Sequence, residues 1–302
     1  MQSVHPFYLS VVNNPVHVII YVILIYILIS ILVFFSQDYF LFKPEKLKPE
    51  FQFQYNNLDF DEHIVDIKPG VSLSVLRFKS KNPRGIVLYL KGNSRSIKGW
   101  GKFAIDFIRY NHDVIMVDYR GFGKSTGRRS QQGIKDDLQL VYDKIKEQVH
   151  EQFIVIYGRS FGSGFATKLA STNNPRMLVL DAPYYSMAKT TGRYLPFLPM
   201  SLLLKFPIPT YKWIKYVKCP IHIIHGTNDN LIPFKSSIKL AEINPTNTEF
   251  HPVIGGGHNN LHTYESYHEI LSQIFTCDHS DFESDQSSMK FEFKKKKHPR
   301  FS

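Results

Sequence analysis

The chain has 302 residues, 43% of them hydrophobic and 21% charged, and a formal net charge of +11. Its length suits one α/β domain behind an apolar N-terminus. The two cysteines, Cys219 and Cys277, exclude a disulfide framework, and no Cys/His cluster has the spacing of metal ligands. The basic excess is not accompanied by a finger, a helix-turn-helix or an aromatic-basic block. We therefore expect no metal, no cofactor and no nucleic-acid partner.

The first predicted element is an apolar helix near the N-terminus. Residues 16–35 contain no Asp, Glu, Lys or Arg, and a helix of about 20 such residues spans the hydrocarbon core of a bilayer. A removable signal peptide fits less well, because no Lys or Arg precedes the run and no small-x-small cleavage site follows Phe35. We expect a short segment 1–15 and then a retained single-pass helix over 16–36. Lysines follow this helix and none precedes it, which favours a cytoplasmic catalytic domain.

A linker over 37–59 is expected to lead into a domain at 60–276. On either side of a Pro-Gly turn, two short alternating runs predict an antiparallel hairpin over 63–67 and 71–76 at one sheet edge. Further short apolar runs, separated by segments that can hold helices, occur at 85–90, 114–119, 153–157, 177–180 and 220–225. Together with helical spacing over 134–145, this alternation predicts an α/β fold with a mainly parallel sheet and helices on both faces.

Polar loops follow the first two strands of this series. Asn93 stands just past 85–90. In enzymes that transfer an acyl group, a backbone N–H on a loop of this kind stabilises the negatively charged oxygen of the intermediate, so Asn93 is a candidate oxyanion donor. A plain polar turn is the alternative. The glycine-rich segment after 114–119 ends in Lys124 and Ser125, but it lacks the G-x-x-x-x-G-K-[ST] spacing of a phosphate-binding loop. We interpret it as a tight turn and expect no nucleotide site.

The strand over 153–157 is followed directly by a glycine-flanked serine, in the order Gly158-Arg159-Ser160-Phe161-Gly162. A serine hydroxyl is a poor nucleophile unless a base can reach its proton. Flanking glycines permit a tight turn that holds the serine exposed between a strand and a helix. Ser160 is therefore the candidate nucleophile, and the backbone N–H of Phe161 is a candidate oxyanion donor. A packing turn without chemistry is the alternative.

An acid is expected between the serine and the histidine in this type of site. Asp229 lies in the polar turn after 220–225 and is the first candidate. A structural turn residue without a catalytic part is the alternative interpretation. Asp181, which follows 177–180, is the second candidate acid.

The candidate base is His258, which follows three glycines after a last short strand over 249–254. A histidine on that loop would take the proton of Ser160, while the acid fixes its tautomer and stabilises the imidazolium. The other histidines, His222 and His225 among them, are interpreted as packing or surface residues.

An insertion over 186–216 is rich in proline, aromatic residues and leucine. It follows a strand end, where α/β sheets bind ligands. We interpret it as a small lid whose apolar underside receives an acyl chain. A cap that packs on the core without touching substrate is the alternative.

The final segment, 277–302, is polar and contains the four-lysine run 294–297. Its composition predicts disorder. A solvated tail and a contact with anionic lipid are both consistent with the lysines.

Five sequence blocks within 60–276 resemble, in the same order, the signature blocks of α/β-hydrolases. They are most similar to the membrane-anchored branch that includes bacterial hydrolases, eukaryotic hydrolase-domain depalmitoylases and lysophospholipases. The blocks lie at 91–93, 118–125, 158–164, 225–229 and 256–259. The resemblance implies that Ser160 is the nucleophile, Asp229 the acid and His258 the base. It also implies that Asn93 and Phe161 are the oxyanion donors. The family usually has His-Gly-Asn where this chain has Lys91-Gly92-Asn93, a departure that concerns the oxyanion loop and leaves the other three residues untouched.

These features together predict a membrane-anchored serine hydrolase that cleaves an ester, thioester or similar acyl bond through an acyl-Ser160 intermediate. Its expected partners are the membrane and an acyl-bearing substrate, which is a lipid, an acylated protein or a small ester. A serine peptidase with the same three residues and a catalytically silent hydrolase fold that binds a lipid or a protein are the alternatives.

Overall fold

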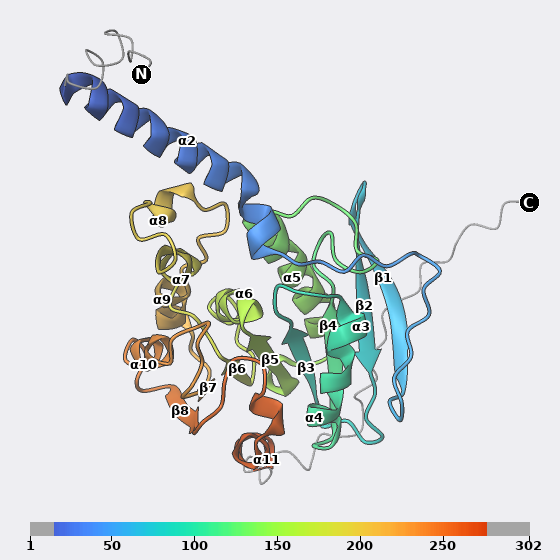
Figure 1. Cartoon of the computed structure of the whole chain (residues 1–302). Coiled ribbons are helices and arrows are strands. Elements are labelled where there is room, and N and C mark those ends of the chain that lie inside the picture. The colour runs from blue at the N-terminus through green and yellow to red at the C-terminus, as the bar shows by residue number, and fades with distance from the viewer. Residues whose placement is uncertain (1–14, 277–302) are drawn as a thin grey trace, which may run out of the picture.

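The apolar N-terminal run folds into one long helix, α2 (Pro15–Leu41), in the computed structural model, which describes residues 15–276 (Figure 1). Within that range it is the one helix long and apolar enough to cross a membrane. It continues to Leu41, past the predicted end at 36. The polar residue Gln37 is accommodated because its side-chain amide donates to the carbonyl of Leu203 and accepts from the backbone N–H of Lys205. The predicted tail over 277–302, with Cys277 and the lysine run, lies outside the described residues.

Eight strands of the described residues form one sheet in the order β1-β2-β4-β3-β5-β6-β7-β8. Their bounds are β1 (Phe60–Lys68), β2 (Val71–Phe78), β3 (Gly85–Leu90), β4 (His112–Val117), β5 (Ile154–Arg159), β6 (Met177–Asp181), β7 (Ile221–Gly226) and β8 (Thr248–Val253). β1 and β2 pair antiparallel, as do β2 and β4, and the other pairs are parallel. The predicted hairpin and mainly parallel sheet are confirmed. β4 ends at Val117 rather than 119, because Asp118 leaves the sheet and its carboxylate accepts the backbone N–H of Ile97.

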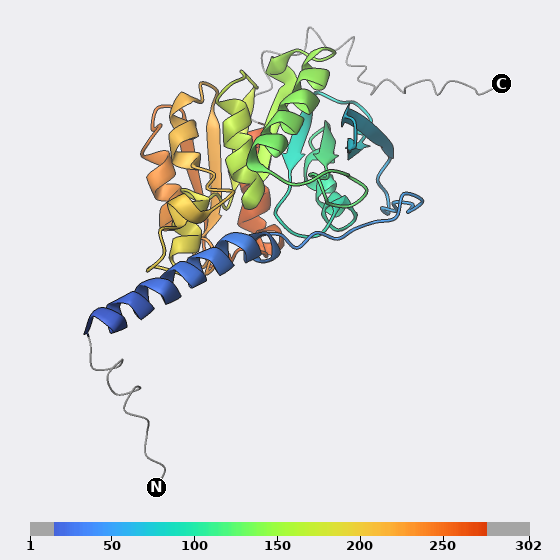
Figure 2. The same cartoon turned by 90° about the horizontal axis from the view of Figure 1, so that it is seen from above.

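Helices cover both faces of the sheet, as Figure 2 shows. One face carries α5 (Gln131–Lys146), α6 (Phe161–Ala170) and α10 (Lys235–Ala241), and the other carries α3 (Ile97–Trp100), α4 (Ile105–Ile108) and α11 (Glu265–Thr276). The predicted crossover helix over 134–145 is the central part of α5.

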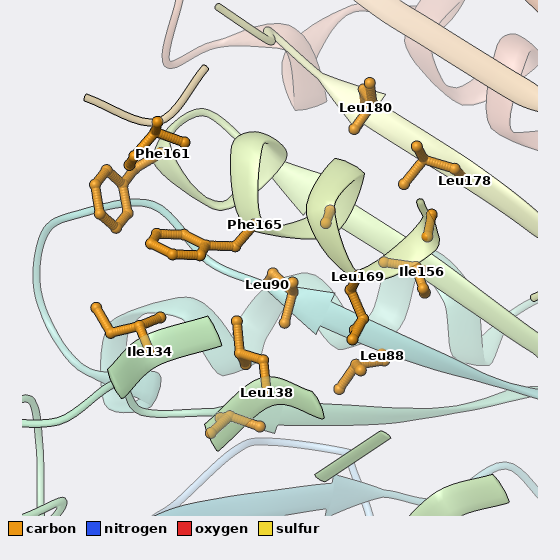
Figure 3. Close-up of a cluster of buried hydrophobic side chains, with 14 of the residues drawn as sticks. Leu88, Leu90, Ile134, Leu138, Ile156, Phe161, Phe165, Leu169, Leu178 and Leu180 are labelled. Atoms are coloured by element: carbon orange, nitrogen blue, oxygen red, sulfur yellow. The ribbon is translucent and has the colours of Figure 1, made fainter. Parts of the chain in front are cut away.

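The side chains on the two faces of each central strand pack into two separate hydrophobic cores. Leu88 and Leu90 of β3 pack in a cluster with Phe165 of α6 (Figure 3). The alternate residues Val87 and Tyr89 belong to the cluster that includes α4 and α11. Successive side chains of a strand point to opposite faces, so a strand covered on both sides is apolar throughout. The carboxyl ends of the parallel strands meet at one edge, and the candidate site lies there.

The segment after α2, expected as a linker over 37–59, packs against the domain. Phe42 is buried, and the centroid of its ring lies 5.2 Å from that of Phe161. Its neighbours form two isolated parallel bridges with loops of the domain, Lys43 with Ser94 and Lys46 with Gly123. The chain from α2 to β1 is therefore held along the loops that follow β3 and β4.

The insertion over 186–216, here called the lid, contains α7 (Met187–Gly192), α8 (Met200–Leu203) and α9 (Thr210–Trp213). Figures 1 and 2 show α8 beside α2. Met200 and Phe206 of the lid are buried in the core that includes α6. The lid therefore packs on the core and also reaches α2.

Candidate active site

Ser160 occupies the sharp turn between β5 and α6. Its φ is +52°, in the left-handed region that few non-glycine residues adopt. The backbone N–H of Ser160 donates to the carbonyl of Asp181 over 2.8 Å, which ties the turn to β6. A Cβ atom at Gly162 would overlap the backbone carbonyls of Leu90 and Lys91. The turn therefore requires glycine at 162, because α6 passes very close to the end of β3.

The Ser160 hydroxyl lies next to the predicted histidine. Its Oγ is 2.9 Å from Nε2 of His258, and Nδ1 of that ring is 2.7 Å from Oδ2 of Asp229. His258 sits on the loop after β8, which is anchored by a hydrogen bond from the N–H of Gly255 to the Thr227 hydroxyl. Three residues from the ends of β5, β7 and β8 thus form one continuous hydrogen-bonded series.

Asp229 is held by backbone as well as side-chain donors. Its Oδ1 accepts the N–H groups of Leu231 and Ile232, each over 2.8 Å. Burial raises the pKa of this carboxyl, but hydrogen bonds from His225 and His258 outweigh burial and hold the pKa below its usual range. The group is therefore a carboxylate at neutral pH.

His225 contacts the same carboxylate and was not predicted to take part in the site. Its Nε2 is 3.1 Å from both Oδ2 of Asp229 and the carbonyl of Ile232, and its Nδ1 is 2.6 Å from the Ser237 hydroxyl. Because the two partners of Nε2 are acceptors, this nitrogen carries the proton. The strand-end position favoured a packing role, yet the four-residue spacing to Asp229 was a signal that could have identified it.

Asp181, the second candidate acid, has other partners. It is fully buried, with Oδ2 3.4 Å from Nε of Arg159 and 2.7 Å from the Tyr157 hydroxyl. Its backbone carbonyl, rather than its carboxylate, contacts Ser160. The structure brings Asp229, not Asp181, to the ring of His258.

The two predicted oxyanion donors lie with Ser160 on the wall of one cavity. Phe161 is the first residue of α6, where the positive end of the helix dipole favours a developing negative charge. The loop that contains Asn93 is tied to α2 and to the segment after it. The Asn93 side-chain amide donates to the carbonyl of Leu41, and the backbone carbonyl of Asn93 accepts the N–H of Lys43. The sequence did not indicate this link between the oxyanion loop and the N-terminal helix.

Lys91, the departure from the family pattern, is fully buried beneath this loop. Its Nζ lies 3.5 Å from Oδ1 of Asp118 and 3.9 Å from the centroid of the Phe122 ring. Burial lowers the pKa of Lys91 to about 8 and raises the pKa of Asp118 to about 6, in each case against the attraction of the partner. The carbonyl of Lys91 accepts the Tyr119 hydroxyl. A buried ion pair therefore lies beside the loop that contains Asn93.

We expect Lys91→Met to destabilise the protein by about 3–5 kcal/mol, because it leaves the Asp118 carboxylate buried without its cation. Urea unfolding followed by circular dichroism measures this change. Lys98→Met is the matched control: it removes an exposed pair with Glu45 and should cost less than about 1 kcal/mol. Adding Asp118→Asn to the Lys91 variant should restore part of the loss. Equal stabilities of the two lysine variants would contradict the assignment.

The cavity beside Ser160 has a volume of about 610 Å³ and is lined by α2, by the lid and by residues that follow several strands of the sheet. α2 contributes Val33, Ser36, Gln37, Phe40 and Leu41, and the lid contributes Met187, Thr190, Thr191, Tyr194, Leu195, Met200 and Leu204. The remainder is Asn93, Ser160, Phe161, Tyr184, Leu231 and Ile232. No lining residue is charged. A more open hollow of about 710 Å³ lies elsewhere, near α9, and Ser160 does not line it.

A group of possible metal ligands lies apart from this site on β7 and β8. The ligand atoms of His222, Glu249 and His251 lie within 4.8 Å of one another, and Nδ1 of His222 is 3.1 Å from Nε2 of His251. This group was not predicted, because strand pairing brings together residues that are far apart in the chain. It has no contact with the series formed by Ser160, His258 and Asp229 among the described hydrogen bonds.

The chain is similar to one family model and to several curated proteins. The family described as serine aminopeptidase, S33 (Hydrolase_4), matches residues 81–217, a range that ends before Asp229. An uncharacterized protein of Mycobacterium tuberculosis is 30% identical over 200 residues, covering 65% of this chain and 71% of that protein. The alpha/beta hydrolase domain-containing protein aho-3 of Caenorhabditis elegans is 28% identical over 212 residues, which cover 66% of this chain and 60% of that protein.

Two further matches extend this picture. The lysophosphatidylserine lipase ABHD12 of Danio rerio is 25% identical over 191 residues, which cover 55% of this chain and 48% of that protein. The chain thus spans about half to three-fifths of two of these relatives. Among solved structures, the Pyrococcus furiosus esterase Pf2001 superposes with a TM-score of 0.62 at 19% identity, covering 78% of this chain and 96% of that one.

Proposed function

Because this chain belongs to the α/β-hydrolase superfamily, we propose that it is a membrane-anchored serine hydrolase that cleaves an ester or thioester of a fatty acid. The observation that carries the proposal is the hydrogen-bonded series from Ser160 Oγ through His258 to Asp229, at 2.9 and 2.7 Å. Distances of this size allow direct proton transfer between nucleophile and base. The series opens into an apolar cavity with room for an acyl chain.

In the first half of the reaction, Oγ of Ser160 attacks the acyl carbon while Nε2 of His258 takes the hydroxyl proton. Asp229 accepts a hydrogen bond from the Nδ1–H group of the ring and stabilises the imidazolium. The N–H groups of Phe161 and of the Asn93 loop stabilise the oxyanion of the tetrahedral intermediate. The bond to the alcohol or thiol then breaks, the leaving group takes the proton from His258, and the acyl group remains on Ser160.

In the second half, water replaces the leaving group. His258 takes a proton from the water as it attacks the acyl carbon, and then returns that proton to Oγ of Ser160. The fatty acid leaves and the free enzyme is restored. His225 supports both halves as a positioning residue, because it donates to Asp229 and keeps that carboxylate ionised and oriented.

We expect Asp229→Asn to lower kcat by about 10⁴-fold, because the amide no longer fixes the His258 tautomer or stabilises the imidazolium. The variant should also lose an acid-sensitive part of its stability. The pKa of Asp229 is lower in the folded state than the ordinary value of about 3.9, so its carboxylate stabilises the fold above that pH and ceases to do so as the pH falls further. Ester hydrolysis at pH 8 and thermal unfolding from pH 2 to 7 measure the two effects.

Asp181→Asn is the comparison for this prediction. It should lower stability through Arg159 and Tyr157 but leave kcat of the folded fraction within about tenfold of wild type. A larger kcat loss from Asp181→Asn than from Asp229→Asn would reverse the assignment of the acid.

A peptidase is the second candidate function, since the matching family is described as serine aminopeptidase. An aminopeptidase must accommodate the ammonium group of its substrate, and a buried cation requires a carboxylate partner. The cavity beside Ser160 is lined by no charged residue, which supports an acyl substrate instead. Parallel assays with p-nitrophenyl butyrate and alanine p-nitroanilide test the choice: faster cleavage of the anilide would favour the peptidase, and cleavage of neither would favour the silent fold.

A further inference from the structure

The lid and α2 lie side by side along a large part of the helix. The Tyr26 hydroxyl donates to the carbonyl of Phe197 over 3.3 Å, and the Gln37 amide donates to the carbonyl of Leu203 over 3.1 Å. The separation of eleven positions between Tyr26 and Gln37 corresponds to about 16 Å of helix at a rise of 1.5 Å per residue. The contact is therefore a lengthwise one and not a touch at the end of α2.

The part of the lid that makes these contacts carries no charge. Residues 194–204, here called the lid tip, contain no Asp, Glu, Lys or Arg, and Arg193 and Lys205 flank them. The lid tip also leaves large apolar side chains exposed, with Tyr194 at 60%, Phe197 at 60% and Leu202 at 81%. An exposed apolar patch with cations at its two ends is suited to the hydrocarbon edge of a bilayer, where long cationic side chains reach toward the headgroups.

The position of α2 in a bilayer determines how deep the lid tip lies. The charge-free run of α2 over 16–35 matches a hydrocarbon core of about 30 Å, and Tyr26 lies at the middle of that run. A lid tip that is hydrogen-bonded to Tyr26 lies beside hydrocarbon whenever α2 spans the bilayer. The exposed side chains of the lid tip would then face lipid instead of water.

The cavity at Ser160 begins at this same contact. The cavity lining includes Val33, Ser36 and Phe40 of α2 together with Tyr194, Leu195 and Leu204 of the lid tip. The route from the bilayer to the nucleophile therefore runs between α2 and the lid tip. The backbone N–H groups of Lys43 and Lys205 donate to the backbone carbonyl of Asn93 and the side-chain carbonyl of Gln37, two residues of the cavity lining.

We propose that the substrate is a bilayer lipid ester whose acyl chain enters the cavity sideways from the hydrocarbon, between α2 and the lid tip. α2 is then a wall of the acyl-binding site as well as an anchor. This inference rests on the proposed function, since the chain that enters is the one transferred to Ser160. The ester C–O bond breaks, the acyl–Ser160 bond forms, and the headgroup alcohol leaves with the proton carried by His258.

The test uses the full chain in phosphatidylcholine vesicles, with 1-palmitoyl lysophosphatidylcholine as the lipid probe and p-nitrophenyl acetate as a soluble reporter. Val33→Trp fills the wall formed by α2, and we expect it to lower the ratio of palmitoyl to acetyl hydrolysis by about tenfold or more. Ile31→Trp is the matched control. Ile31 is 47% exposed and lies outside the cavity lining, so its ratio should equal that of wild type.

A second pair of variants tests the lid tip. Leu202→Arg puts a charge where the lid tip would meet hydrocarbon, and it should lower hydrolysis of the vesicle lipid relative to the acetate ester by about tenfold. Ile64→Arg, which places the same charge on the exposed side of the edge strand β1, should leave that ratio unchanged.

The possible failures are distinguishable. If wild type neither cleaves the acetate ester nor reacts with a fluorophosphonate, the proposed function itself is wrong. If wild type is active but Val33→Trp and Ile31→Trp have the same ratio, entry along α2 is overturned while the hydrolase assignment stands. If wild type cleaves an S-palmitoylated peptide in solution faster than the vesicle lipid, the assignment to a bilayer lipid is overturned.

Discussion

Ser160→Ala is expected to lower kcat/KM for p-nitrophenyl butyrate by about 10⁴- to 10⁶-fold, because no other described side chain at the turn can accept the acyl group. The remaining rate would come from the oxyanion donors and substrate binding. A fluorophosphonate probe should add its phosphonyl mass to wild type and leave Ser160→Ala unlabelled. Ser171→Ala, at the far end of α6, is the control and should react as wild type does.

The stability of variants at this position gives a second, independent readout. A non-glycine residue in the left-handed region costs about 1–3 kcal/mol when the surroundings impose it. With φ at +52°, Ser160→Gly should therefore unfold at a higher temperature than Ser160→Ala, although both lack the hydroxyl. Undiminished labelling of both variants would contradict the role of Ser160 as nucleophile. An Ala variant more stable than the Gly variant would contradict the strained turn.

Gly162→Ala is expected to prevent soluble folding or to destabilise the protein by several kcal/mol. The added Cβ would overlap the backbone carbonyls of Leu90 and Lys91, and backbone atoms cannot move aside as a flexible side chain can. Relief of the overlap would require α6 to shift away from β3, which carries the oxyanion loop. The measurements are the soluble fraction on expression and the unfolding temperature of whatever is recovered.

Gly192→Ala is the control for this substitution. The nearest atom to its Cβ would be Cγ of Met200 at 3.9 Å, an ordinary contact. Alanine in the helix α7 should be neutral or stabilising by up to about 1 kcal/mol. If the two glycine variants unfold at the same temperature, α6 and β3 do not approach each other as closely as described.

Most of the sheet could be predicted from the sequence, because parallel strands that are covered on both faces are apolar throughout. The ends of helices and strands were harder to predict, because hydrogen-bond partners that are distant in the sequence determine where they lie. Gln37 and Asp38 interrupt the apolar run and indicated an end to the first helix. α2 nevertheless continues to Leu41, because the lid supplies hydrogen bonds to Gln37.

The candidate site shows the same division between local and long-range information. Ser160, Asp229 and His258 could be named because each follows a strand in a glycine-rich or polar loop, and the catalytic role of each stays a prediction. His225 was interpreted as a packing residue because it ends a strand, although its four-residue spacing to Asp229 was a signal in the sequence. Only the return of the chain after β7 places Asp229, Ile232 and Ser237 around its ring.

The pairing of the segment after α2 with the oxyanion loop has a kinetic consequence. A flexible tether would let the catalytic domain tumble and sample solutes in a wide volume. Here the bridge from Lys43 to Ser94 and the burial of Phe42 fix the tilt and height of the domain relative to α2. If α2 spans a bilayer, the enzyme meets its substrate by two-dimensional diffusion. Its rate should then follow the mole fraction of substrate in the membrane and fall on surface dilution with inert lipid, even when the total substrate in the sample is unchanged.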